Sequence, residues 1–162
     1  MQVLALDPSI LHLGWATLNS LGALSFGTIK APAEMKEGSL VERIAWMLKE
    51  LNDVNLCGVH RIVIEQPEPW GAYKSLASSR SGSLLMLQML TGAIVGWALS
   101  QTYSISDQEV VLVKVSQWKG QLPKNVTKMR MERKYNCKFA TTDEADAVGL
   151  ADWYLQQGEK NV

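Results

Sequence analysis

Two short apolar segments, Val3-Leu4-Ala5-Leu6-Asp7 and Arg61-Ile62-Val63-Ile64-Glu65, decide the fold expected for this chain. Apolar runs of about four to eight residues, bounded by turn-forming residues, are typical of buried β-strands. The boundaries here are Pro8 after the first segment and Pro67 after the second, and proline ends a strand because it cannot donate to the sheet. Each expected strand therefore ends on an acidic residue.

The segments around these strands complete an α/β pattern. Two more strands are expected at 13–18 and 23–29, joined by a turn at 19–22, and a fifth strand is expected at 110–115. Helical patterns are found near 39–53, 83–101, 123–136 and 142–157, and a loop rich in Pro, Ser and Gly at 66–82. This order predicts one α/β domain, residues 1–162, with a five-stranded mixed β-sheet flanked by α-helices.

The composition favours a soluble protein and excludes several classes. The 162 residues are enough to bury a core, and 47% are hydrophobic and 20% charged. Cys57 and Cys137 have no paired spacing, so we expect reduced thiols and a cytoplasmic location, which is the host cytoplasm if the chain is viral. With two histidines in the chain, a histidine-built zinc site is not expected. We also expect no signal peptide and no membrane span, because the apolar stretch 84–99 is short and interrupted.

Four carboxylates are expected to meet at one edge of the sheet. Asp7 and Glu65 end two strands, and adjacent strand ends in an α/β sheet open onto a common crevice. Asp143 and Asp146 stand three apart at the start of the last expected helix, so they share one helix face. Carboxylates brought together repel unless a cation compensates, and Mg²⁺ prefers oxygen ligands, so the four residues predict a metal site. Two such ions can position an attacking water and stabilise the leaving oxygen in phosphodiester hydrolysis.

Each acid also has a purely structural interpretation. Asp7 before proline can start a turn, and Glu65 can reach solvent from its strand end. Thr141 with Glu144 fits a helix capping box, and Asp143 would complement the helix dipole in the first turn. We favour the metal site because all four acids occur together in this order.

The net charge is zero, but the basic residues are concentrated in one segment. Residues 114–138 contain eight basic residues and a single acidic one, Glu132. Such a stripe suits a chain that binds phosphates with one face and metal ions with another, and a solvated helix face is the structural alternative. The candidate phosphate contacts are Lys119, Lys124, Lys128, Arg130 and Lys134.

These motifs resemble those of the RuvC-type Holliday junction resolvases, which belong to the ribonuclease-H-like superfamily. Residues 4–9 (Leu-Ala-Leu-Asp-Pro-Ser) with 14–16 (Gly-Trp-Ala) look like the family's opening strand and hairpin, and 62–66 (Ile-Val-Ile-Glu-Gln) looks like the strand with the catalytic glutamate. Residues 143–151 resemble the closing acidic helix, whose two aspartates stand three apart. Lys119 and Lys124 fall where the family has lysines near the scissile phosphate.

The resemblance implies a homodimer that nicks four-way (Holliday) DNA junctions, with Mg²⁺, or Mn²⁺ in its place, and two ions per site. The implied metal ligands are Asp7, Glu65, Asp143 and Asp146, and Lys119 joins them as a catalytic residue. The loop after Glu65 is longer than usual, and the glycine-rich stretch before Lys124 is shortened to residues 120–123. These differences would suit a divergent, phage-type member.

Two further segments are expected to contact partners. The loop 66–82 leaves the sheet directly after Glu65, so it should lie beside DNA, and an aromatic residue could stack on an unpaired base at the junction centre. Its candidate contacts are Trp70, Tyr73, Lys74 and Arg80, although Trp70 could instead pack under the loop. The helix 83–101 has more apolar surface than one sheet face requires, which predicts a dimer interface, with complete burial in the monomer as the alternative.

Three other functions stay open at this point. The first is another ribonuclease-H-like nuclease. One that cuts RNA–DNA hybrids would carry its second acid on the first helix, as Glu42 or Glu50, whereas Glu65 is better placed. One that cuts other branched DNA would share the same site. An actin-like or sugar-kinase ATPase half opens with a similar strand, but the chain has no second copy of that unit and no glycine-rich phosphate loop. A non-catalytic junction-binding module would not need all four carboxylates.

Overall fold

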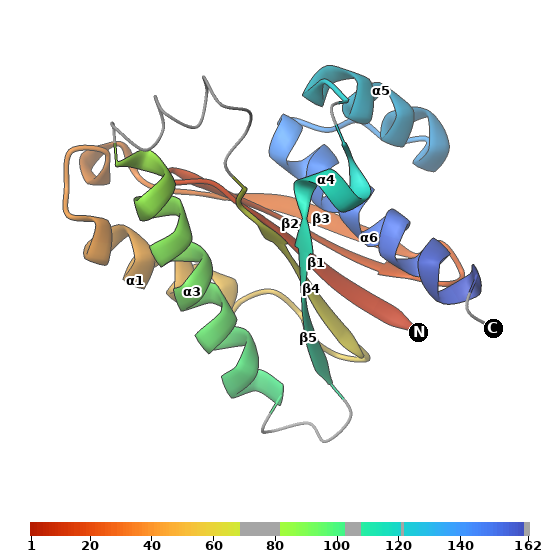
Figure 1. Ribbon diagram of the computed structural model, residues 1–162, viewed down its shortest axis with the longest axis horizontal. Helices are drawn as coiled ribbons and strands as arrows, with labels where there is room; N and C mark the ends of the chain where they lie inside the picture. Colours follow the sequence, from red (N-terminus) through yellow and green to blue (C-terminus); the bar gives the residue numbers. More distant parts are fainter. Residues whose placement is uncertain (69–81, 103–107, 121, 161–162) are drawn as a thin grey trace.

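A mixed five-stranded sheet lies at the centre of the computed structural model, which describes residues 1–68, 82–102, 108–120 and 122–160. The strands are β1 (Gln2–Pro8), β2 (His12–Asn19), β3 (Leu24–Lys30), β4 (Arg61–Gln66) and β5 (Glu109–Lys114). Their order is β3-β2-β1-β4-β5, with β1 antiparallel to β2 and parallel to β4 (Figure 1). The five-stranded mixed sheet predicted from the sequence is therefore confirmed.

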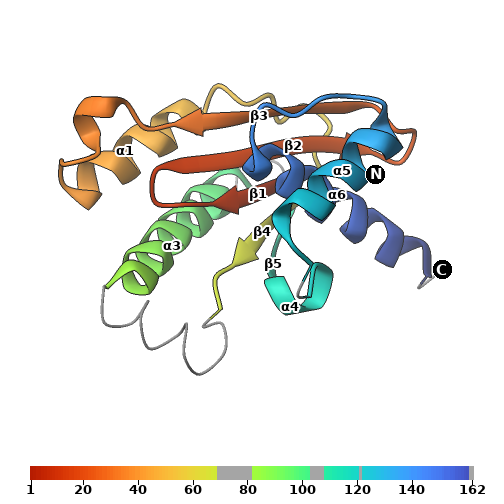
Figure 2. The same cartoon turned by 90° about the horizontal axis from the view of Figure 1, so that it is seen from above.

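Helices cover both faces of this sheet (Figures 1 and 2). On one face lie α1 (Leu40–Leu51) and α3 (Ser83–Thr102). On the other lies α6 (Thr142–Lys160), with α5 (Lys124–Tyr135) packed outside it. The 3-10 helix η1 (Ala33–Met35) and the one-turn helix α4 (Val115–Trp118) were not expected, because a single turn is too short to show periodicity.

The alternation of side chains along β1 and β4 places their acids together. Val3, Ala5 and Val63 pack in the cluster that includes α6, whereas Leu4, Leu6, Ile62 and Ile64 pack on the α1 and α3 side. Side chains two apart on a strand share a face, so Asp7 and Glu65 continue the row on the α6 side. Leu6 pairs with Ile64 in the parallel register, and the two acids follow side by side.

A reciprocal cap fixes the start of α6. The Thr141 hydroxyl accepts from the Glu144 backbone N–H at 3.1 Å, and the Glu144 carboxylate accepts from the Thr141 N–H at 3.3 Å. The Glu144 carboxylate also accepts from the Thr28 hydroxyl on β3 at 3.1 Å. The capping box predicted from the sequence is confirmed, and it ties the first turn of α6 to the sheet.

Gly14 allows α6 to approach the sheet closely. A Cβ atom built on Gly14 would lie 2.2 Å from the carbonyl oxygen of Asp143 and 2.5 Å from its carbonyl carbon. Gly14 also pairs with Asp7 in the β1–β2 register. Because no side chain intervenes at Gly14, the backbone of Asp143 lies against β2 directly beside Asp7.

We therefore expect Gly14→Ala to be destabilising although Gly14 is in a strand, where alanine normally costs little. The added methyl group overlaps backbone atoms, which cannot rotate away, and overpacking of this kind costs about 1–3 kcal/mol. Urea denaturation in EDTA measures the change in the free energy of unfolding. An unchanged free energy in the alanine variant would show that α6 does not depend on this close approach.

Candidate metal-dependent active site

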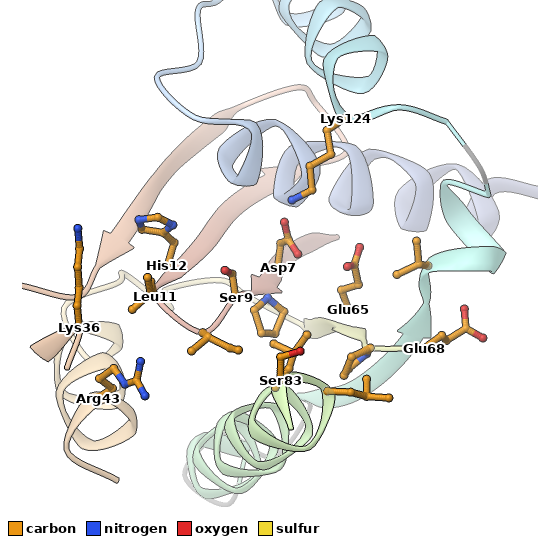
Figure 3. Close-up of a pocket in the computed structure, with 16 residues that line it drawn as sticks. Asp7, Ser9, Leu11, His12, Lys36, Arg43, Glu65, Glu68, Ser83 and Lys124 are labelled. Atoms are coloured by element: carbon orange, nitrogen blue, oxygen red, sulfur yellow. The ribbon is translucent and has the colours of Figure 1, made fainter. Parts of the chain in front are cut away.

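The four carboxylates selected from the sequence lie at one edge of the sheet. Asp7 is 4% exposed at the end of β1, and Glu65 lies beside it at the end of β4. Asp146 is 1% exposed and Asp143 is 9% exposed, and both reach the site from the first turns of α6. Figure 3 shows Asp7 and Glu65 turned toward the same space beneath α6. The predicted convergence is thus present in the structure.

Two lysines from the basic stripe extend into the same place. Lys119 directly follows α4, and its ammonium lies 2.5 Å from Asp146 Oδ2. Lys124 is the first residue of α5, and its ammonium lies 3.0 Å from Asp143 Oδ1 and 3.6 Å from Asp146 Oδ2. Figure 3 shows the Lys124 side chain pointing toward Asp7. Both lysines are therefore counter-charges of the carboxylate cluster.

The lysines leave part of the negative charge uncompensated. Asp7 Oδ2 and Asp146 Oδ1 are buried without a hydrogen-bond partner in the described part of the chain. Burial, followed by the neighbouring Glu65 carboxylate, raises the pKa of Asp7 well above its ordinary value of 3.8, although Lys124 opposes the shift. Burial, followed by Asp146, also raises the pKa of Glu65, and burial raises the pKa of Asp146 despite the bond from Lys119. Each carboxylate is thus costly to ionise without a further cation.

The residues present fit a divalent cation by donor type and by charge. Mg²⁺ takes oxygen ligands, and the two buried aspartate oxygens without partners are of that kind. As the side chains stand, no three His, Cys, Asp or Glu residues of the described chain are grouped around one metal position. The ammonium groups of Lys119 and Lys124 bond to the α6 aspartates there, so these two side chains would have to move for an ion to bind.

Two residues of the site carry no signal in the sequence. The indole N–H of Trp118 donates to Glu65 Oε2 at 2.9 Å, which fixes that carboxylate from the side opposite Asp7 in the strand order. His12 Nδ1 lies 3.7 Å from Asp143 Oδ2. A tryptophan on a short helix and a histidine at a strand start have no motif, so only the packing of distant elements identifies them.

The other predicted DNA contacts have different positions. Lys128 and Arg130 lie on α5, the helix that begins at Lys124. The Lys134 ammonium is 2.6 Å from Asp152 on α6, and the same carboxylate oxygen accepts from the Tyr135 hydroxyl at 2.7 Å. Lys134 therefore fastens α5 to α6. Four more predicted contacts lie outside the described residues: Trp70, Tyr73, Lys74 and Arg80.

An open pocket of about 600 Å³ adjoins the carboxylates (Figure 3). Asp7, Glu65 and Lys124 line it, together with the turn between β1 and β2 and the first turns of α3. The two strand-end acids, of which Asp7 is buried and Glu65 half-buried, therefore border a space large enough for part of a substrate.

Solved structures of RuvC have the same arrangement of elements. T. thermophilus RuvC in complex with a Holliday junction substrate matches with a TM-score of 0.65 and 17% identity, covering 98% of this chain and 97% of that one. A further Thermus thermophilus RuvC structure matches with a TM-score of 0.60 and 19% identity over the same shares. No protein-family model matches, and neither does any curated protein. The chain has a RuvC-like, ribonuclease-H-like fold, as its motifs indicated.

We expect Asp7→Asn to stabilise the metal-free protein at neutral pH. A carboxyl group whose pKa is higher in the folded chain binds more protons when folded, so stability decreases as pH rises above the ordinary carboxyl range. The amide removes that penalty and flattens the pH dependence. Thermal melting in EDTA between pH 4 and 8 measures the effect, at about 2–4 °C for each kcal/mol in a domain of this size.

Thermal melting of the same two proteins in Mg²⁺ tests whether Asp7 binds the ion. Ion binding to the folded state stabilises by about 2.7 kcal/mol at a hundredfold excess over the dissociation constant, and this gain should be present in wild type and lost in Asp7→Asn. An Asp7→Asn variant that melts below wild type in EDTA, with the same dependence of melting temperature on pH, would contradict the prediction. It would show that ionised Asp7 does not destabilise the metal-free protein.

Proposed function

We propose that the chain is a metal-dependent endonuclease that nicks four-way DNA junctions, acting as a homodimer. The observation that carries the proposal is the cluster of four carboxylates, three of them buried and two with an unpartnered oxygen, beside an open pocket. Its support is the RuvC-like fold, since one solved neighbour is T. thermophilus RuvC in complex with a Holliday junction substrate. Other branched DNA has the same backbone chemistry and belongs in the same assay.

The proposed ligands of one or two Mg²⁺ ions are Asp7, Glu65, Asp143 and Asp146. Bound there, the metal would activate water and stabilise the leaving oxygen in phosphodiester hydrolysis, and Mn²⁺ could replace Mg²⁺. Trp118 holds Glu65 in place through its indole N–H. Lys119 and Lys124, once released from the α6 aspartates, would neutralise the scissile phosphate, where fixed positive charge stabilises the transition state.

The positions of the two acids on α1, Glu42 and Glu50, favour this proposal over the active-site arrangement of a ribonuclease H. The Glu42 carboxylate accepts from the Ser39 backbone N–H at 3.2 Å and completes the capping box of α1. Glu50 lies in the last turn of that helix, on the face of the sheet opposite α6. The acid that adjoins Asp7 is Glu65, from a strand.

Glu65→Gln and Asp146→Asn should each abolish nicking of a four-way junction in Mg²⁺ and leave junction binding close to wild type. Affinity comes mainly from phosphate contacts, whereas the carboxylates hold the metal. Denaturing gels of end-labelled junction strands measure nicking, and gel shifts in Ca²⁺ measure binding. Glu50→Gln is the matched control, and it should cut normally.

The same assay separates the rival nucleases. Full activity of Glu65→Gln would show that the site is wrongly assigned. Loss of activity in Glu50→Gln, together with cleavage of an RNA–DNA hybrid and not of the junction, would support the ribonuclease H alternative. Tight junction binding without cleavage in Mg²⁺ or Mn²⁺ would support a non-catalytic module.

The dimer proposal rests on the exposed face of α3. Leu90, Ile94 and Trp97 bury one side of this helix in the core. The other side exposes Leu85 (63%) and Met89 (50%). Farther along it, Gly92 and Gly96 have open space above them.

Among the described helices, α3 is the one long and apolar enough to cross a membrane, but its buried side belongs to the sheet core. A second copy of α3 would cover the exposed apolar side without changing that core.

Met89→Glu should therefore convert the dimer to a monomer while the fold is kept. A charge on the exposed face is accommodated by water in the monomer and is costly in an apolar interface. Analytical ultracentrifugation at micromolar concentration measures the change, and circular dichroism monitors folding. Met129→Glu on α5 is the control, because Met129 is also exposed, at 67%. A wild-type chain that sediments as a monomer and still makes paired nicks would contradict the proposal.

A further inference from the structure

The pocket beside the carboxylates has a second, basic end. The acids Asp7 and Glu65 line one side of it, and Figure 3 shows His12, Lys36 and Arg43 on the other. These three come from the start of β2, the segment after η1, and the second turn of α1. None of them belongs to the basic stripe of residues 114–138, so the pocket joins two separate sources of positive charge around the acids.

Arg43 is the unusual residue of this group. It is 9% exposed, and its buried Nε has no hydrogen-bond partner. No salt bridge joins it to any acid among the described residues. Figure 3 shows its guanidinium turned into the pocket, whereas the Lys36 amine is at the rim. A buried charge is costly unless it is paired, so an anion from outside the chain would stabilise the guanidinium group.

The chemistry of that anion follows from the guanidinium and its setting. Arginine binds phosphate and carboxylate oxygens through two parallel N–H donors, a geometry that lysine cannot provide. The pocket opens directly onto the proposed hydrolytic site, so the anion that a bound DNA strand would bring there is a backbone phosphate. His12 and Lys36 add further donors on the same side.

We propose that Arg43, with Lys36 and His12, forms a phosphate subsite that holds a neighbouring backbone phosphate of the DNA strand cut at the carboxylates. The inference rests on the proposed nuclease function for the identity of its ligand, and on Arg43 alone for the existence of an anion site. The subsite fixes the position of the strand along the pocket, so that the scissile phosphate lies at Asp7 and Glu65.

Arg43→Met is the informative variant, because it keeps an unbranched apolar stem as far as about the position of Nε and removes the charged guanidinium group. Fluorescence anisotropy with a labelled four-way junction in Ca²⁺, over a series of NaCl concentrations, gives affinity and its salt dependence. We expect a loss of about tenfold or more in affinity and a decrease of about 0.9 in the slope of log K against log salt. Arg43→Lys should keep the slope and lose part of the affinity.

Two controls separate binding from folding. Lys49→Met removes an exposed charge from the same helix, away from the pocket, and should leave the slope unchanged. Without DNA, Arg43→Met should melt no lower than wild type, because it removes an uncompensated buried charge. An Arg43→Met variant that melts lower and keeps the wild-type salt slope would show that Arg43 is structural, and would overturn the proposal.

A second probe, inorganic phosphate in EDTA, tests the subsite without DNA. Millimolar phosphate should raise the melting temperature of wild type and Lys49→Met more than that of Arg43→Met, at matched ionic strength. Equal shifts in all three proteins would overturn the subsite even if junctions are bound. A shift lost only in Arg43→Met, from a chain that binds no junction, would keep the subsite and reject the nuclease proposal.

Discussion

The contact between Gly14 and the backbone of Asp143 is the constraint on which the site depends. Asp7 and Gly14 are paired across β1 and β2, so whatever packs on Gly14 also lies beside Asp7. The absence of a side chain there lets the first turn of α6 reach the sheet. The cap formed by Thr141 and Glu144, with the bond from Thr28, fixes the direction of the helix. Carboxylates distant in sequence are brought together as a result.

This arrangement has an energetic cost that the protein offsets only in part. Burial and mutual repulsion disfavour the ionised forms of Asp7, Glu65 and Asp146, and two ammonium groups compensate for some of that charge. Burial lowers the pKa of Lys124, but the nearby carboxylates of Asp7, Asp143 and Asp146 raise it by more. Lys124 therefore stays charged. Groups kept in an unfavourable state by the surrounding fold are typical of functional sites. The same charges that weaken the metal-free protein would favour the binding of a cation.

The sequence could predict the carboxylates because their signals are local. Asp7 and Glu65 end apolar runs, Asp143 and Asp146 share a helix face, and the charge stripe indicated Lys119 and Lys124. The bond from Trp118 to Glu65 and the position of Arg43 in the pocket depend on how separate elements pack, so no local pattern marks them. For Lys134, the basic residues around it in the sequence suggested a DNA contact. The packing of α5 on α6 pairs its ammonium group with Asp152. The helices η1 and α4 have too few residues for a periodic signal.

We propose that the edge formed by Asp7, Glu65, Asp143 and Asp146 is a divalent metal site. Anomalous diffraction from crystals of the protein grown with Mn²⁺ tests it most directly, because the anomalous signal locates the ion independently of the protein atoms. We expect an anomalous peak in contact with Asp7 and Asp146, with the Lys119 and Lys124 ammonium groups moved away from the α6 aspartates. Saturating Mn²⁺ that gives no peak at these carboxylates, with both lysine pairs intact, would contradict it.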